Sequence, residues 1–575
     1  MKLDIVIRNG MVVDGTGNPW FQTDVGIKDG KIAALGKLNG VDATREIDAT
    51  GLVVSPGFVD AHAHSDYLIL ADPTNENKLL QGATLDVAGN CGYSAAPIGE
   101  VFFREWWTPD IDERFTVCSA EEGRKLLADH GVDFNWTTMD GYLSAIDAAR
   151  PSTNYLNFTG QVALRLAAYG EYGRQPTDEE FARMKELTHQ SMREGSFGVS
   201  TESGGHKEMD FDVEELIELC KIAAEYGGIY SNHMRDYGMD VVASTEEALY
   251  ISEQADIPSI ISHIGVAGRH KGVPAESILS LIDRGRERGL QVTADLMPFG
   301  YSESLTFTAL ARDMLPESAT ADGHEAFKQE IADPESRERL KQELRDGASS
   351  RWYVSPTAKE GEAYSEGPLA RDDWADGLEF VICAERRFEG RRAAEIAREE
   401  GMDPFDVLFQ AIAADWDTAK VFYTSWTEED LKLMVQHPWV SFGGDGAQTK
   451  AMWEKRPGVP NPTQYCIFPM ILGRYVRQKG WLRSEDAIRK MTSLPCNAIG
   501  IYDRGVIRPG AWADITIFDP DTIIDTPSYY DYPETYARGI HHVIVNGFSA
   551  VLDGQQTGER PGKALRISAM NGVTR

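Results

Sequence analysis

Short apolar segments recur between residues 84 and 445, and helical stretches separate several of them. The segments are TLDVAGNCG, YLNFTGQ, SFGVST, GGIYSNH, PSIISHI, LQVTADLMP and WVSFGGD. The stretches between them include DVEELIELCKIAAEYG, STEEALYISEQADIP and PAESILSLIDRGRERG. Strands that alternate with helices predict an α/β fold with parallel strands and crossover helices. With the earlier segment GLVVSPGFVDAH the pattern supplies about eight strands, the number that closes a (β/α)8 barrel, or TIM barrel.

Both ends of the chain are predicted to form short β-strands instead. The first residues contain LDIVIRNG, MVVDGTG and DVGIKDG, and the last contain ADITIFDP and HHVIVNG, all bounded by turn residues. Because chain termini commonly lie close together, we expect residues 1–55 and 501–575 to form one small β-sandwich domain. The barrel is then expected over 56–500, with insertions at about 101–150 and 301–400 where the alternation breaks down.

Composition and charge narrow the partners that the protein can have. Lys and Arg number 57 against 90 Asp and Glu, which gives a formal net charge of -33. This charge repels phosphates and anionic lipids, so neither nucleic acid nor a membrane surface is expected as a partner. The first residues lack a signal-peptide pattern, and no apolar run reaches the roughly 18 residues of a membrane span. A cytoplasmic location is therefore expected, whereas the oligomeric state stays open.

Six cysteines are scattered singly through the sequence, without the paired spacing of a disulfide framework. In a reducing compartment this distribution predicts free thiols. A cysteine with a function would then act as a metal ligand or as a nucleophile.

The strongest local motif is Asp60-Ala-His62-Ala-His64, at the end of an apolar run. Residues two apart on a strand point to the same side, so His62 and His64 can present their imidazoles to one metal ion. The alternative is a solvent-exposed loop in which the two histidines are incidental.

Two further histidines end predicted strands, His233 in GIYSNH and His263 in SIISH. They are thirty residues apart with a helix between them, which is one βα unit and places them on neighbouring strands at the same height. Each alone could be a core or surface histidine, but both together favour ligation. Four histidines can hold two divalent cations if an anionic ligand lies between them.

At this point the sequence resembles the amidohydrolase superfamily, and within it the N-acyl-D-amino-acid deacylase (D-aminoacylase) group. The resemblance rests on PGFVDAHAH, GNCGYSAAP, REGSFGVST, YSNHMR, ISHIG, QVTADLMPF, VSFGGDG and KMTSLPCNAIGIYDRGVIRPGAWADITIFDP, which occur in family order over nearly the whole chain. It implies a (β/α)8 barrel that holds one or two Zn²⁺ ions and hydrolyses an amide bond of a small molecule.

The resemblance also implies roles for individual residues. Cys91 matches the cysteine that bridges the metals in the deacylase group, and a thiolate is a soft anionic ligand suited to zinc. A buried, inert thiol is the alternative, in which case Glu202 could bridge instead. Asp445 matches the family's catalytic aspartate, which binds metal, takes a proton from the attacking water and passes it to the departing amine. The sequence GGDG around it would also suit an ordinary turn.

Substrate recognition is predicted less specifically. Arg235 and Tyr301 are candidates to bind a substrate carboxylate. The sequence also departs from the deacylase pattern, with Gly265 where a lysine is typical, Gly160-Gln161 in place of glycine-histidine, and Asn461-Pro462-Thr463-Gln464-Tyr465 in place of a turn with histidine and arginine. These departures leave the metal chemistry intact but leave the substrate open.

The resulting prediction is a metal-dependent hydrolase that cuts the C–N bond of an N-acyl-D-amino acid or a related linear amide. A ring-opening hydrolase of cyclic amides or lactones, similar to hydantoinases, is the alternative, because it would not need the lost cations. A barrel that has become a non-catalytic binding protein is the third possibility. Retention of His62, His64, His233, His263 and Asp445 argues against it.

Overall fold

The structure is a computed structural model of the 575-residue chain. The residues that it describes are 2–104, 116–129, 131–203, 211–237, 240–266, 274–299, 303–306, 315–320, 322–347, 369, 374–383, 385–416, 420–423, 426–446, 462–525 and 537–567. Within these ranges, no helix combines the length and the apolar character that crossing a membrane requires.

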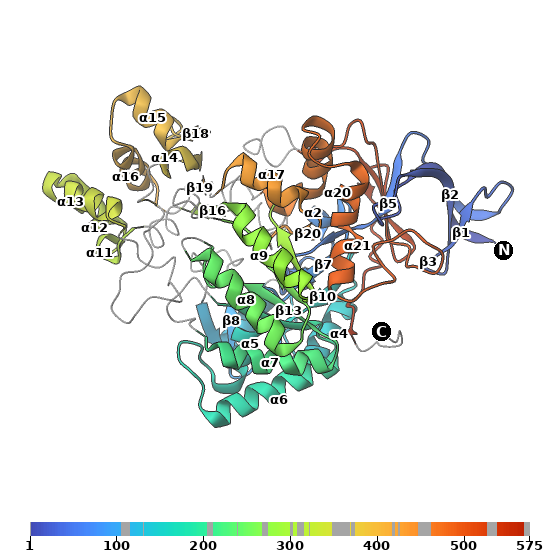
Figure 1. The fold of residues 1–575 in the computed structure, drawn as a ribbon, viewed down its shortest axis with the longest axis horizontal. Coiled ribbons are helices and arrows are strands. Elements are labelled where there is room, and N and C mark those ends of the chain that lie inside the picture. The colour runs from blue at the N-terminus through green and yellow to red at the C-terminus, as the bar shows by residue number, and fades with distance from the viewer. Residues whose placement is uncertain are drawn as a thin grey trace.

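The two ends of the chain build one nine-stranded sheet. Its strands are β1 (Leu3–Val12), β2 (Phe21–Lys28), β3 (Lys31–Gly36), β4 (Ala43–Asp48), β5 (Val53–Pro56), β21 (Ile515–Phe518), β22 (Ile540–Val545), β23 (Phe548–Leu552) and β24 (Gln555–Gln556). Strand β5 joins the two parts, because it pairs with β1 on one side and with β21 on the other. Figure 1 shows this sheet at one end of the molecule, next to the N-terminus. The prediction that both chain ends share one small β domain is confirmed.

Parallel strands form the barrel. They are β6 (Phe58–Asp60), β7 (Ala83–Ala88), β10 (Asn154–Asn157), β11 (Thr159–Gly160), β12 (Gly198–Glu202), β13 (Ile229–His233), β14 (Ser259–Ile261), β15 (Val292–Leu296) and β20 (Val440–Phe442). Strands β10 and β11 follow each other in one strand position, so the order β6-β7-β10/β11-β12-β13-β14-β15-β20 fills eight positions. The Ala61 amide donates to the Phe442 carbonyl at 3.2 Å and closes the ring. The predicted (β/α)8 barrel is confirmed.

Helices cover the outside of the barrel, where their apolar faces pack against the strands (Figure 1). They include α4 (Met139–Ala149), α5 (Gln161–Tyr169), α6 (Asp178–Glu194), α7 (Val213–Glu225), α8 (Val241–Ala255), α9 (Ala275–Glu287), α17 (Glu428–Gln436) and α20 (Ser484–Met491). Helix α6 shows how local sequence sets a boundary. The Thr177 hydroxyl accepts from the Glu180 amide, and the Glu180 carboxylate accepts from the Thr177 amide, which satisfies two amides that the first turn leaves free.

Short helices fill the connections. These are α1 (Leu68–Ala71) and α2 (Glu76–Leu79) after β6, and η4 (Pro462–Gln464), α19 (Ile467–Met470), η5 (Ile471–Gln478) and α21 (Ser493–Ala498) between β20 and β21. Between β7 and β10, strands β8 (Val101–Arg104) and β9 (Thr116–Ser119) form an antiparallel pair followed by α3 (Ala120–Asp129) and α4. This region corresponds to the first predicted insertion.

The second insertion is larger and has its own apolar core. Its four-stranded sheet, in the order β16-β19-β17-β18, consists of β16 (Glu303–Thr306), β17 (Leu378–Ile382), β18 (Arg391–Arg392) and β19 (Lys420–Tyr423). Its helices are α11 (Glu317–Thr320), α12 (His324–Ala332), α13 (Pro334–Arg345), α14 (Trp374–Gly377), α15 (Ala393–Glu400) and α16 (Pro404–Ala414). In Figure 1 it projects from the barrel on the side opposite the terminal sheet. The sequence puts its end at about 400, but α16 and β19 belong to the same core and sheet, so it extends to Tyr423.

Candidate metal centre

Six predicted ligands lie at the carboxyl ends of barrel strands. They are His62 and His64 after β6, Cys91 after β7, His233 at the end of β13, His263 after β14 and Asp445 after β20. In a parallel barrel these ends form one mouth, so residues up to 383 positions apart in sequence meet there. The structure brings all six together.

The ligand atoms form two groups that share Cys91. His62, His64 and Cys91 make up one, and Cys91, His233 and His263 make up the other, with ligand atoms within 4.8 Å of one another in each. The Cys91 sulfur lies 3.3 Å from His62 Nε2 and 3.4 Å from His263 Nε2. A thiolate in this position can bridge two cations.

Asp445 lies beside the first group. Its Oδ1 lies 3.1 Å from His64 Nε2 and 3.6 Å from His62 Nε2. We call His62, His64, Asp445 and the shared Cys91 the His62–His64 half, and His233, His263 and Cys91 the His233–His263 half.

The backbone is unusual at three of these residues. Cys91, His263 and Asp445 have φ values of 51°, 32° and 44°, in the left-handed region that residues with a side chain seldom adopt. Each lies two or three residues beyond the end of a barrel strand, in the turn that leads away from it. Strained conformations of this kind concentrate at functional sites, where the surrounding structure holds them in place.

Two glycines before Asp445 allow its turn to lie against the first histidine segment. A Cβ on Gly443 would come within 2.5 Å of the His62 Cβ, and one on Gly444 within 2.8 Å of the Thr463 carbonyl oxygen. Larger residues would push Asp445 away from His62. The sequence GGDG is therefore required by close packing as well as by the turn.

Charges at the centre favour the anionic ligand forms. Burial would raise the pKa of the Cys91 thiol, but His62 and His263 outweigh it and hold that pKa well below its usual range. Burial opposes ionisation of Asp445 as well, yet its hydrogen bond with His64 and the charge of His62 hold its pKa well below the usual value. Imidazoles around a thiolate and a carboxylate are the donor set that zinc prefers, so these residues fit this metal.

Asp295, a residue that the sequence analysis missed, holds parts of both halves. Its Oδ2 lies 3.3 Å from His62 Nδ1, and its Oδ1 accepts the His263 backbone amide at 2.6 Å. Asp60 has a related role, since its Oδ1 accepts the backbone amides of His62 and Gly444. The available signal was an acidic residue inside an otherwise apolar strand, as in QVTADLMP.

Glu202, predicted as an alternative bridge, lies outside both ligand groups in the described part of the chain. It ends β12 and is buried, and its carboxylate is hydrogen-bonded to Tyr93. Burial, followed by the negative charge of Glu202 and this hydrogen bond, raises the pKa of the Tyr93 hydroxyl well above its usual value. Cys91, in contrast, belongs to both groups.

The predicted substrate residues are only partly described. Arg235 is buried, with its Nε 3.1 Å from Glu247 Oε1 and its Nη2 donating to the Phe211 carbonyl, and its role in substrate binding stays a prediction. Tyr301 lies outside the described residues. Of the positions that depart from the deacylase pattern, Gly265 packs against the Trp426 indole, and Gln161 donates to Glu215.

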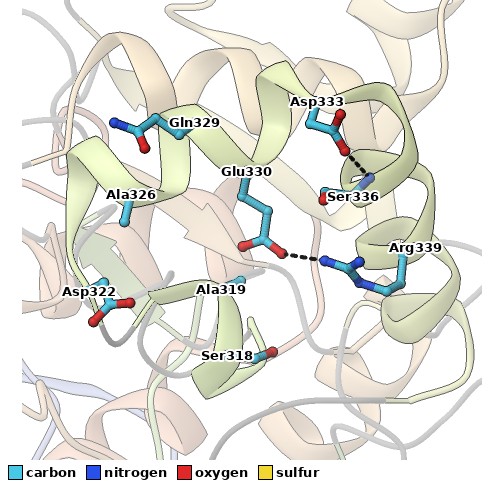
Figure 2. Close-up of a pocket in the computed structure, with 9 residues that line it drawn as sticks. All are labelled: Ser318, Ala319, Asp322, Ala326, Gln329, Glu330, Asp333, Ser336 and Arg339. Atoms are coloured by element: carbon cyan, nitrogen blue, oxygen red, sulfur yellow. Dashed lines mark hydrogen bonds and ion pairs between the residues drawn. The ribbon is translucent and has the colours of Figure 1, made fainter.

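The structure also has an open pocket of about 380 Å³ in the second insertion, between α11, α12 and α13 (Figure 2). Its lining residues are Ser318, Ala319, Asp322, Ala326, Gln329, Glu330, Asp333, Ser336 and Arg339. Glu330 already pairs with Arg339 at 3.3 Å, and Asp333 caps α13 through the Ser336 amide. These polar groups satisfy one another, and none belongs to the metal centre.

Comparison with known proteins agrees with this geometry. The Amidohydrolase family matches residues 45–262 and 375–550, and the N-terminal domain of the urease alpha-subunit matches residues 1–58. N-acyl-D-glutamate deacylase of Alcaligenes xylosoxydans xylosoxydans is 30% identical over 99% of this chain and 97% of its own.

Solved structures give the same result. The N-acyl-D-glutamate deacylase of Bordetella bronchiseptica, complexed with zinc and a phosphonate inhibitor, has a TM-score of 0.70 and 28% identity. A D-aminoacylase structure concerned with its binuclear metal centre has a TM-score of 0.72 and 28% identity. Both comparisons cover 98% of this chain and 100% of the other. The family match extends over more than half of the sequence, and the chain belongs to the amidohydrolase family.

Proposed function

We propose that this protein is a metal-dependent hydrolase that cuts the amide bond of an N-acyl-D-amino acid or a related linear amide. The observation that carries the proposal is the pair of ligand groups sharing Cys91, with Asp445 3.1 Å from a histidine of one of them. The relatives named above act on N-acyl-D-amino acids and are similar to this chain over nearly its whole length.

Zinc is the proposed cofactor, one ion or two. His62, His64 and Asp445 would hold one ion, His233 and His263 the other, and the Cys91 thiolate would lie between them. When bound, zinc lowers the pKa of water from 15.7 to roughly 7 and polarises a carbonyl. Bridging by Glu202 is the weaker alternative, because its carboxylate is engaged with Tyr93.

Asp445 is the proposed general base and acid. Burial opposes ionisation of Asp445, but the hydrogen bond with His64 and the charge of His62 hold the pKa of Asp445 well below its usual value. The carboxylate is therefore ionised at neutral pH. It can then accept a proton from the attacking water and deliver it to the nitrogen of the departing amine. The same oxygen faces His62 and His64, which hold it at the mouth of the barrel.

Gly265 stands where a lysine is typical of the deacylase pattern, and a Cβ on this residue would lie 2.7 Å from the Trp426 ring. We propose that an uncharged substrate side chain is accepted there, with Arg235 and Tyr301 as candidates for binding the carboxylate.

The proposed setting is the cytosol. The described cysteines Cys91, Cys220, Cys383, Cys466 and Cys496 are free thiols, and a Cys91 that serves as a ligand has to stay reduced.

The test is to offer zinc-reconstituted protein N-acetyl-D-amino acids with acidic, apolar and polar side chains, together with their L forms, hydantoins and lactones. We expect release of free amine from D substrates and little from their L forms. Turnover of cyclic amides alone would replace the proposal by the ring-opening alternative. Absence of turnover on every substrate by fully metal-loaded protein would refute catalysis.

A further inference from the structure

We infer that Asp295 is a positioning residue that fixes the tautomer of His62, and that the His62–His64 half depends on it for metal binding. Asp295 lies in the strand β15 and is 1% exposed, so its carboxylate is committed to groups of the protein. This inference rests on the proposed function insofar as the centre has to bind metal. It does not depend on which amide is hydrolysed.

The contacts of His62 assign one task to each ring nitrogen. Nε2 faces the Cys91 sulfur at 3.3 Å and Asp445 Oδ1 at 3.6 Å, so this nitrogen points into the ligand cluster. Nδ1 faces Asp295 Oδ2 at 3.3 Å. A neutral imidazole has one N–H and one lone pair. If Nδ1 donates to Asp295, the lone pair is on Nε2, where a cation needs it.

The other carboxylate oxygen of Asp295 is also occupied. Oδ1 accepts the backbone amide of His263 at 2.6 Å, the shorter of the two contacts. His263 is held with a φ of 32°, and this bond helps to stabilise that conformation. Asp295 thus accepts one hydrogen bond from the His62 side chain and one from the His263 backbone amide, and each bond requires a different carboxylate oxygen as its acceptor.

This requirement makes asparagine a sharp probe. The Asp295→Asn amide has one oxygen, and the shorter bond to the His263 amide should keep it. The NH2 group then faces His62 Nδ1. Because an NH2 group can only donate, Nδ1 has to act as the acceptor, and the His62 proton moves to Nε2. The lone pair that would bind metal is lost, while the His233–His263 half keeps its ligands unchanged.

The experiment is a stepwise Co²⁺ titration of metal-free wild type, Asp295→Asn and two reference variants, with thiolate-to-cobalt absorption and bound metal as readouts. His64→Asn serves as the reference for loss of the His62–His64 half, and His233→Asn for loss of the other. We expect Asp295→Asn to weaken one of two Co²⁺ sites by about 10- to 100-fold, the usual effect of losing an outer-shell partner. The weakened site should be the same one that His64→Asn affects.

Two controls separate orientation from packing and charge. Thr293 lies two residues before Asp295 on the same face of β15, and its hydroxyl has no hydrogen-bond partner among the described residues, so Thr293→Val should leave both Co²⁺ sites unchanged. Asp86 is an equally buried carboxylate on β7 that contacts Ser65 and Lys78, so Asp86→Asn removes the same charge without touching an imidazole.

The outcomes distinguish this inference from the proposed function. The inference would be overturned if Asp295→Asn left Co²⁺ binding unchanged at both sites or weakened both sites equally. It would also be overturned if Asp86→Asn weakened Co²⁺ binding as much as Asp295→Asn does. If Asp295→Asn does not fold, ¹⁵N-histidine spectra of zinc-loaded wild type decide, with His62 assigned by its loss in His62→Gln. A proton on His62 Nδ1 supports the inference, and a proton on Nε2 refutes it. Failure on every amide substrate would count only against the proposed function.

Discussion

The two halves of the metal centre share Cys91 but differ in what surrounds their imidazoles. In the His62–His64 half each ring faces a carboxylate, at 3.3 Å for His62 with Asp295 and 3.1 Å for His64 with Asp445. In the His233–His263 half the ring of Tyr237 lies 5.2 and 5.1 Å from the two histidine rings. Apart from the shared thiolate, the negative groups that contact the imidazole rings therefore lie in the His62–His64 half, although Asp295 also accepts the His263 backbone amide.

The pKa values of the histidines follow this asymmetry. Although burial opposes it, hydrogen bonds to Asp445 and Cys91 raise the pKa of His64 to about 10. Burial and the neighbouring His263 lower the pKa of His233 below its usual value. A cation entering the His62–His64 half has to displace protons, whereas His233 is already neutral. We therefore expect the His233–His263 half to fill first.

The largest effect should come from Cys91→Ala, because it removes the ligand that the halves have in common. Zinc affinity should fall in both halves by more than the roughly 10- to 100-fold that an outer-shell partner contributes. Metal content after dialysis, measured by elemental analysis, gives the result. Cys220→Ala, which removes another buried free thiol, is the control and should keep its metal. Retention of both ions in Cys91→Ala would show that the halves are independent.

The next largest effect is expected for Asp445→Asn, which changes the His62–His64 half alone. Loss of the proposed general base should lower kcat by roughly 10²- to 10⁴-fold. The His233–His263 half should still bind zinc, because Asp445 Oδ1 lies against His64 and His62. Steady-state kinetics and metal content on the same samples separate the two effects. Full turnover in this variant would remove Asp445 from the mechanism.

The four candidate histidine ligands were predictable from short-range sequence, whereas Cys91 and Asp445 were identified through the resemblance to the deacylase group. His62 and His64 share a face through the alternation of a strand, and His233 and His263 each end an apolar segment. The barrel was predictable for a similar reason, since the alternation of strands and helices extends along most of the chain.

The supporting groups were not predictable, because they depend on how distant strands align. Asp295 on β15 reaches His62 after β6, a contact across 233 positions that no local pattern encodes. Lys78 is a second example, because it is buried and pairs with Asp60, yet nothing in the sequence of its helix α2 distinguishes it from a surface lysine. The strand β19 was not predictable as part of the second insertion, because it joins the sheet of that insertion only after α15 and α16.

A smaller effect should follow removal of zinc. Ligands that bind only the folded state stabilise it, by about 2.7 kcal/mol for one site at a free concentration of 100 Kd. We expect zinc to raise the free energy of unfolding in two steps, and His64→Asn to keep only the first. Urea unfolding over a series of free zinc concentrations measures both steps. If His64→Asn lost the first step instead, the proposed order of filling would be reversed.

The smallest effects on zinc binding are expected from substitutions that only change packing near one half. A methyl group at Gly443 would meet the His62 Cβ at 2.5 Å, and one at Gly265 would meet the Trp426 ring at 2.7 Å. Both Gly443→Ala and Gly265→Ala overpack buried regions, at a cost of about 1–3 kcal/mol each. Only the first pushes directly on a ligand, so it alone should weaken zinc binding in the His62–His64 half. Thermal unfolding and metal stoichiometry test this, and equal metal loss in both variants would mean that the mouth of the barrel responds to strain as one unit.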